Sequence, residues 1–313
     1  MSSYELTREI RAEAAKVVLG KDAAIRKVLM AILARGHVLL EDVPGTGKTT
    51  LAKTFSKILG LDSKRVQFTS DTLPSDIIGF SVYDREKGEL EYKSGAVMTN
   101  LLLADEINRT SSKTQSALLK AMEEYHVTVD GVTHPLPEPF VVLATQNPVG
   151  SAGTTLLPAS QMDRFLIRTS MGYPDVNSQI SILKERHHDN PIDHIVPVTD
   201  EDGVRKLIAE TAEVHIADAV YAYIVSLVER TRKHELIELG ISPRGTLAVC
   251  RMAKARAFVL GRDYVTPEDV VEIFPDVCGH RLVLSAKARM NKQSAQTIID
   301  GILREIAIPQ LRA

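Results

Sequence analysis

The first part of the chain alternates short apolar runs with segments of helical spacing. Tyr4–Val18 and Lys21–Leu33 carry apolar residues three and four positions apart, which predicts two amphipathic helices. His37–Leu40 is a short apolar run before a glycine-rich turn, and Thr49–Leu59 is helical again. Further short apolar runs, which predict strands, are Val66–Phe68, Asn100–Ala104, Phe140–Ala144 and Phe165–Ser170. Strands that alternate with helices predict an α/β fold with a parallel sheet.

Two segments depart from this alternation. Ser81–Tyr92 alternates apolar and polar residues around Gly88, which predicts a hairpin inserted into the α/β pattern. Val127–Val132 contains Asp130 and Gly131 between β-forming residues, which is a strong hairpin signature. We therefore expect two antiparallel additions, near residues 81–92 and 127–132.

The pattern changes near Tyr173-Pro174-Asp175, after which helical spacing dominates. Helices are expected over Ala217–Thr231, over Thr246–Leu260, from Thr266 with Pro267 at the first helical position, and over a last long region, Ser285–Leu311. We therefore expect an α/β domain over residues 1–173 and a smaller, all-helical domain over residues 174–313.

The composition limits which classes of protein this chain can belong to. The chain has 313 residues, 44% of them hydrophobic, so it can bury a core, and its net charge of −2 gives no global attraction to nucleic acid or anionic membrane. The two cysteines, Cys250 and Cys278, are far apart, which is typical of a reducing compartment. No apolar run approaches the ~18 residues of a membrane helix. We expect no membrane span and a cytoplasmic location.

The run HVLLEDVPGTGKTT, from His37 to Thr50, has the composition of a phosphate-binding loop between a strand and a helix. Its glycines let successive backbone N–H groups point at one anion, and the following helix presents its positive end there. Lys48 is expected to reach the β- and γ-phosphates of ATP, and the Thr49 hydroxyl to hold Mg²⁺. The residues assigned to the nucleotide are Pro44, Gly45, Thr46, Gly47, Lys48, Thr49 and Thr50. The pattern G-x-x-x-x-G-K-S/T has glycine where this chain has Asp42, but the remaining positions are in register.

Polar residues also end two other predicted strands. Asn100–Ala104 leads into Asp105 and Glu106, at the sheet edge where such folds bind ligands. We assign Asp105 to Mg²⁺ and Glu106 to activation of the attacking water, since adjacent strand residues point opposite ways. Phe140–Ala144 leads to Asn147, whose amide could position that water, although by itself an asparagine there is typical of a turn.

With these strand ends in order, the chain resembles AAA+ ATPases of the MoxR family over essentially its whole length. The most specific segments are EDVPGTGKT, LLLADEINR, ATQNP and SPRG, and the loop without its first glycine fits the family. The resemblance implies that Asn147 is the sensor 1 residue and Arg244 the sensor 2 residue. It also implies that Arg164 is an arginine finger acting on the neighbouring subunit's ATP, with Arg168 as a rival.

The same resemblance places adenine against the VVLG segment. The residues implied there are Val17, Val18, Leu19 and Gly20. It further implies a ring, expected to be a hexamer, that hydrolyses ATP with Mg²⁺. The ring would remodel, mature or activate a client protein that the sequence does not identify, and metal or cofactor insertion is one form that this activity could take.

Three other functions are possible for a chain with a phosphate-binding loop. One is a nucleic-acid motor, but His126–His134 carries an acid and no Lys or Arg, so we expect no nucleic-acid partner. Another is a nucleotide switch without turnover, which would have no need of Glu106. A magnesium-chelatase-like subunit stays open by similarity.

Overall fold

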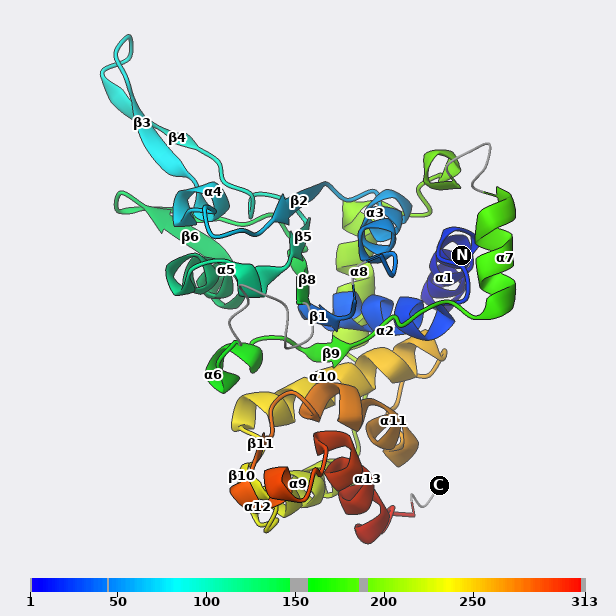
Figure 1. Cartoon of the computed structure of the whole chain (residues 1–313). Coiled ribbons are helices and arrows are strands. Elements are labelled where there is room, and N and C mark those ends of the chain that lie inside the picture. Colours follow the sequence, from blue (N-terminus) through cyan, green and yellow to red (C-terminus); the bar gives the residue numbers. More distant parts are fainter. Residues whose placement is uncertain (1, 44, 147–156, 186–190, 311–313) are drawn as a thin grey trace.

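A five-stranded parallel sheet forms the centre of the computed structural model, which describes residues 2–43, 45–146, 157–185 and 191–310 (Figure 1). The strand order is β2-β5-β8-β1-β9. The strands are β1 (Val38–Glu41), β2 (Ser63–Gln67), β5 (Leu101–Asp105), β8 (Val141–Gln146) and β9 (Ile167–Thr169). β5 and β8 are buried along their whole length, which explains why they are nearly continuous apolar runs in the sequence. The parallel α/β core is confirmed.

Alternate strand residues face the two sides of this sheet. On one side Leu40, Leu103 and Leu143 join a core cluster with apolar residues of the nearby helices α1 (Ser3–Val17), α2 (Asp22–Leu33) and α3 (Lys48–Ile58). On the other side Leu102 and Val142 pack with residues of α5 (Ser112–Glu124). The short elements α4 (Pro74–Ile78), η1 (Ile107–Arg109) and α6 (Ala159–Met162) belong to this second side of the molecule.

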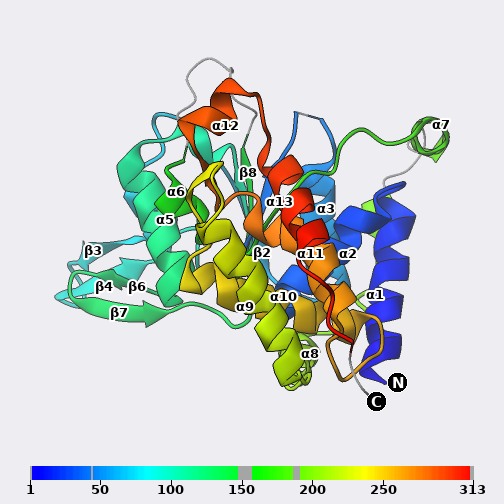
Figure 2. The same ribbon diagram turned by 90° about the horizontal axis from the view of Figure 1, so that it is seen from below.

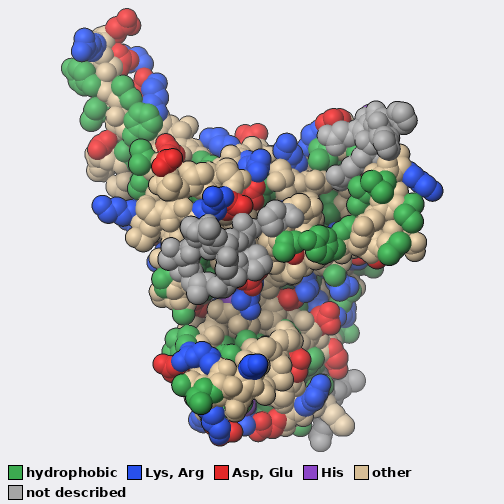
Figure 3. Space-filling model, viewed as in Figure 1, with side chains coloured by type: hydrophobic (Ala, Val, Ile, Leu, Met, Phe, Trp, Pro, Cys, Tyr) green, Lys and Arg blue, Asp and Glu red, His purple; other side chains and the backbone are tan. Residues whose placement is uncertain are grey.

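Two antiparallel hairpins extend from the second side, next to each other in both views (Figures 1 and 2). One pairs β3 (Phe80–Asp84) with β4 (Glu89–Lys93), and the other pairs β6 (His126–Val129) with β7 (Val132–Pro135). The rings of Tyr92 and His134 stack between them, with centroids 3.9 Å apart. The first hairpin reaches farthest from the core and exposes hydrophobic side chains (Figure 3), among them Phe80, Val82, Tyr83 and Leu90.

The second half of the chain is largely helical. Its elements are α7 (Val176–Glu185), η2 (Pro191–His194), α8 (Glu201–Ala212), α9 (Asp218–Arg232), β10 (Ile237–Leu239), α10 (Pro243–Val259), α11 (Pro267–Cys278), β11 (Val283–Leu284), α12 (Ala286–Met290) and α13 (Ala295–Glu305). The expectation of one long helical region from Ser285 is wrong. Lys292 has a φ of 52°, which ends α12, and Ser294 caps a new helix with its hydroxyl. The expectation of no strands is also wrong, because β10 and β11 pair.

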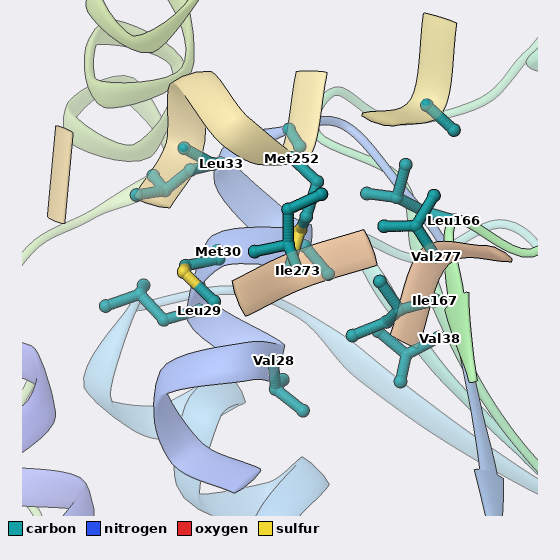
Figure 4. Close-up of a cluster of buried hydrophobic side chains, with 14 of the residues drawn as sticks. Val28, Leu29, Met30, Leu33, Val38, Leu166, Ile167, Met252, Ile273 and Val277 are labelled. Carbon is teal, nitrogen blue, oxygen red and sulfur yellow. The ribbon is translucent and has the colours of Figure 1, made fainter. Parts of the chain in front are cut away.

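The helical half shares one apolar cluster with the α/β half. Figure 4 shows Met252 of α10 and Ile273 of α11 beside Met30 of α2 and Ile167 of β9. These residues are at most 3% exposed. The division into residues 1–173 and 174–313 therefore stays a proposal about chain organisation, since the cores of the two parts are continuous. None of the helices that the structure describes has the length and apolarity to cross a bilayer.

Candidate nucleotide site

The loop after β1 has the backbone of a phosphate-binding loop. Gly45 and Gly47 have φ values of 85° and 90°, which residues with a side chain rarely adopt. Gly47 is the N-cap of α3, so the helix begins at Lys48 and its first N–H groups face the loop. Pro44 lies outside the described residues. This geometry provides backbone donors and the positive end of a helix for an anion.

Lys48 is buried, and its ammonium group turns back onto the loop. Its Nζ donates to the carbonyl oxygens of Val43 at 2.9 Å and Asp42 at 3.3 Å. Burial lowers the pKa of Lys48, and the nearby charges of Asp42, Asp105 and Glu106 partly oppose that shift. The loop lysine and the acids at the end of β5 therefore lie close enough to interact, as one site requires.

Asp42, the residue that replaces the first glycine of the pattern, ties the loop to the end of β9. Its carboxylate accepts hydrogen bonds from the Ser170 hydroxyl and from the backbone N–H groups of Met171 and Gly172. Asp42 is 5% exposed. The side chain therefore has a structural task that a glycine could not perform.

Asp105 is held at the carboxyl end of β5 by two neighbouring strands. Its Oδ1 accepts from the Thr145 hydroxyl of β8 at 2.8 Å, and its Oδ2 accepts from Nη2 of Arg65, on β2, at 2.8 Å. A carboxylate has about four lone-pair sites, so acceptor capacity remains for a metal-bound water. Thr49 and Arg65 line one small cavity of about 80 Å³, which brings Thr49 near the partner of Asp105. These oxygens fit Mg²⁺, which is bound through one or two protein groups together with phosphates.

Glu106 starts a sharp turn between β5 and η1. Its φ of 58° and ψ of 47° are left-handed, and its N–H donates to the Thr145 hydroxyl at 2.9 Å. The carboxylate pairs with Arg109 at 2.7 Å. The turn separates the Glu106 side chain from that of Asp105, which suits two different tasks. Thr145, which contacts both residues, was not predicted as a site residue.

A cavity of about 350 Å³ adjoins the loop and has the mixed lining that a nucleotide base and ribose need. Val17, Val18 and Leu19 form one wall, and α7 supplies Ile182 and Leu183. The remaining predicted residues that line it are Gly45, Thr46, Gly47 and Thr50. Gly20 does not line the cavity. Its φ of 68° and its close approach to Ser178 of α7 give it a structural role.

Asn147 lies outside the described residues. The preceding Gln146 donates to Glu41 Oε1 at 3.0 Å, and Glu41 also pairs with Arg168 at 3.2 Å. Arg168 is thus engaged by its own chain at the edge of the sheet that carries the loop. Among the described residues, no group of three or more His, Cys, Asp or Glu side chains could hold a metal ion.

Arg164 and Arg244 meet at the opposite end of the central strands. They line a second cavity with Gly36 and His37, which precede β1, and Leu166, which precedes β9. Because β1 and β9 are parallel and the phosphate loop follows β1, this cavity and the loop lie at opposite edges of the sheet. Both arginines pair with Glu123 of α5. Within one chain, therefore, neither arginine is placed at the phosphate loop.

Comparison with known proteins agrees with this architecture. The model of the ATPase family associated with various cellular activities (AAA) matches residues 37–167, and an AAA lid domain matches residues 229–302. The protein YeaC of Bacillus subtilis is 46% identical over 95% of this chain and 93% of its own. The chaperone MoxR1 of Mycobacterium tuberculosis is 39% identical over 96% of this chain and 82% of its own. A crystal structure from Cytophaga hutchinsonii matches with a TM-score of 0.90 and 38% identity, covering 98% of this chain and 96% of the other.

Proposed function

We propose that this chain, which belongs to the MoxR family of AAA+ ATPases and hydrolyses ATP, works as a Mg²⁺-dependent ring that remodels, matures or activates client proteins. The observation that carries the proposal is the position of Arg164 and Arg244, at the sheet edge opposite the phosphate loop. A subunit with its loop on one side and its arginines on another is suited to head-to-tail assembly, which closes into a ring.

The cis half of the site would bind and polarise ATP. Lys48 would leave the Val43 and Asp42 carbonyls for the β- and γ-phosphates, while Val17, Val18 and Leu19 would contact the base. Thr49 and Asp105 would hold Mg²⁺, which when bound neutralises charge on the phosphates. Glu106 would orient and deprotonate the attacking water, since it lies next to Asp105 on a turn fixed by Thr145. Asn147 stays the predicted sensor 1 residue.

The trans half would come from the next subunit. Arg164 would act as the arginine finger, and Arg244 as sensor 2, both on the ATP of the neighbour. An arginine finger is worth ~10³–10⁵ in rate where it has been measured. Because Arg244 lies in the first turn of α10, its contact with a phosphate would report the nucleotide state to the helical half of the chain.

The trans assignment can be tested by mixing inactive subunits. Rings that combine Arg164→Ala with Glu106→Gln contain sites with an intact finger facing an intact Glu106, so mixing should restore part of the activity that each variant lacks. Arg168→Ala with Glu106→Gln is the matched comparison. If mixtures show only the averaged activity of the two variants, Arg164 acts in cis or outside the site.

The client, the hexameric state and the cytoplasmic location remain predictions. The exposed hydrophobic side chains on the β3–β4 hairpin are a suitable surface for an unfolded or partly folded client. A pull-down with the Glu106→Gln variant in ATP would test for a client, because slow hydrolysis should keep it bound. A nucleic-acid motor is disfavoured by the β6–β7 hairpin, whose residues 126–135 include no Lys or Arg. A magnesium-chelatase-like role would instead show as capture of a metal-carrying partner.

A further inference from the structure

A single carboxylate holds two arginines that come from different parts of the chain. Glu123 lies near the end of α5, where its Oε2 is 3.2 Å from Arg164 Nε and its Oε1 pairs with Arg244 Nη2. We propose that Glu123 stands in for the γ-phosphate in the isolated subunit and competes with the neighbour's ATP for these two arginines. The inference rests on the proposed function, because it assumes that both arginines act in trans.

The other carboxylates around this cavity are already engaged. Arg281 is 2.8 Å from Asp163, and Arg35 is 3.0 Å from Glu138. Arg251 lines the same cavity and has no carboxylate within ion-pair distance in the described part of the chain. Glu123 therefore neutralises one charge among the three of Arg164, Arg244 and Arg251. The cavity keeps an excess of positive charge.

The pairing with Arg164 is also incomplete. The Arg164 Nε atom is buried and within ion-pair distance of Glu123, yet it makes no hydrogen bond of good geometry. A buried donor without an acceptor is costly, so a ligand that aligns better would be favoured. The cavity holds about 150 Å³, which is room for a small anionic group.

A γ-phosphate is suited to displace the carboxylate. It carries more charge than Glu123 and offers three oxygens to guanidinium groups whose planar forks match phosphate geometry. Glu123, Arg164 and Arg244 are partly exposed, at 39%, 29% and 43% of their side chains, so an approaching subunit can reach them. ADP has no γ-phosphate and would leave the carboxylate in place. Glu123 would thus make assembly depend on ATP rather than ADP.

An alternative is that Glu123 is a static brace between α5 and α10. The two roles predict different effects of the bound nucleotide on subunit assembly. Competition with a γ-phosphate affects assembly only when that phosphate is present. A brace would change the shape of the subunit, and hence its assembly, equally with either nucleotide.

The experiment compares Glu123→Gln with wild type by sedimentation velocity over a range of subunit concentrations. With a non-hydrolysable ATP analogue, the concentration at half-assembly should fall about three- to tenfold, the size expected for removing two partly exposed ion pairs. With ADP it should not change. Glu124→Gln is the matched control, because the neighbouring Glu124 pairs with Lys120 and His126 and not with these arginines.

The concentration at half-assembly of Glu123→Gln tests whether Glu123 competes with the γ-phosphate. No shift, a shift to higher concentration, or equal shifts with ATP analogue and ADP would overturn it. In an Arg164→Ala background the effect of Glu123→Gln should shrink, since one of the two arginines for which Glu123 and the γ-phosphate compete is gone. If Glu123→Gln unfolds, Glu123→Asp keeps the charge but is too short to bridge both arginines, and should shift assembly in the same direction. If subunit mixing restores activity while Glu123→Gln leaves assembly unchanged, only this inference fails.

Discussion

The Asp42 carboxylate accepts a 3.0 Å hydrogen bond from the backbone N–H of Gly172, which joins the start of the phosphate loop to the segment that leads into α7. The same carboxylate also accepts from Ser170 and Met171. Gly172 in turn accepts a hydrogen bond from Lys21 at 3.0 Å, so the loop, the end of β9 and the start of α2 share one network. The position that departs from the glycine pattern is thus the one that anchors the loop.

Asp42→Ala should lower the free energy of unfolding by about 2–4 kcal/mol. The buried N–H of Met171 would lose its charged acceptor, and the half-buried N–H of Gly172 would keep only the Ser170 hydroxyl. Urea denaturation measures this difference. Asp71→Ala is the control and should change the free energy of unfolding by less than about 0.5 kcal/mol, since the hydrogen bonds of Asp71 to the described residues are local ones with Thr69 and Ser70.

Asp42→Gly is the more informative variant because it completes the G-x-x-x-x-G-K-T pattern. A better match to the pattern would suggest tighter ATP binding. The structure instead leads us to expect weaker binding, since the loop would lose its attachment to Met171 and Gly172. Titration with a fluorescent ATP analogue distinguishes tighter from weaker binding. Binding by Asp42→Gly that is equal to or tighter than that of wild type would contradict the anchoring role of Asp42.

Lys48→Ala should weaken ATP binding by roughly 100-fold or more, because the ammonium group proposed to bind the β- and γ-phosphates is lost. Its carbonyl partners, Val43 and Asp42, should be satisfied by water, so stability should change little. Calorimetric titration with ATP gives the affinity. Lys287→Ala, on the exposed surface and paired with Glu235, is the control. Retained affinity in Lys48→Ala would remove the loop from the ATP site.

The sequence predicted the parts of this site that follow from local rules. A glycine-rich turn between strand and helix places Lys48 without knowledge of the rest, and a buried strand that ends in two acids places Asp105 and Glu106. The partners that hold these acids were not predictable in this way. Arg65 and Thr145 reach Asp105 from two other strands, and their position depends on the strand order of the sheet.

The location of Arg244 shows the same limit. A motif predicts the role of a residue, but it does not say on which subunit's ATP that residue acts. Arg244 lies beside Arg164 because α10 packs against α2 and α11, which the motif does not show. The division of the last helical region into α12 and α13 was missed for a similar reason. The left-handed backbone of Lys292 ends α12, and the spacing of apolar residues does not indicate it. Glu123 gave no signal in the sequence, because a glutamate near the end of an amphipathic helix is ordinary.

Glu106→Gln should bind ATP with nearly unchanged affinity and hydrolyse it about 10²–10⁴-fold more slowly, the usual contribution of a general base. The substitution keeps the turn, because the hydrogen bond to Thr145 uses the backbone N–H. Phosphate release in steady state measures the rate. Glu89→Gln, on the distant β4 strand, should hydrolyse ATP as wild type does. A normal rate in Glu106→Gln would exclude Glu106 as the base.

His37 supplies a pH-dependent part of the stability next to the arginine cavity. It is buried, its Nε2 donates to the Met122 carbonyl at 2.9 Å, and its Nδ1 accepts from the Val142 N–H at 3.0 Å. The bond from Val142 requires the neutral ring, because a protonated Nδ1 cannot accept, whereas Nε2 can donate to Met122 in either form. Burial, aided by the charge of Arg251 and partly opposed by the Met122 hydrogen bond, lowers the pKa of His37 from 6.5 to about 4.

A pKa that is lower in the folded state means that protonation favours unfolding. The stabilisation by neutral His37 is therefore fully present above pH 6.5 and is lost as the pH falls from 6.5 toward about 4. His37→Gln keeps a donor and an acceptor but does not titrate in this range. The free energy of unfolding of wild type relative to this variant should decrease by about 2–3 kcal/mol between about pH 7.5 and about pH 4.5. Taking the difference removes the titration of the other histidines, which both proteins share, and a difference that stays constant with pH would show that His37 is not held neutral by the fold.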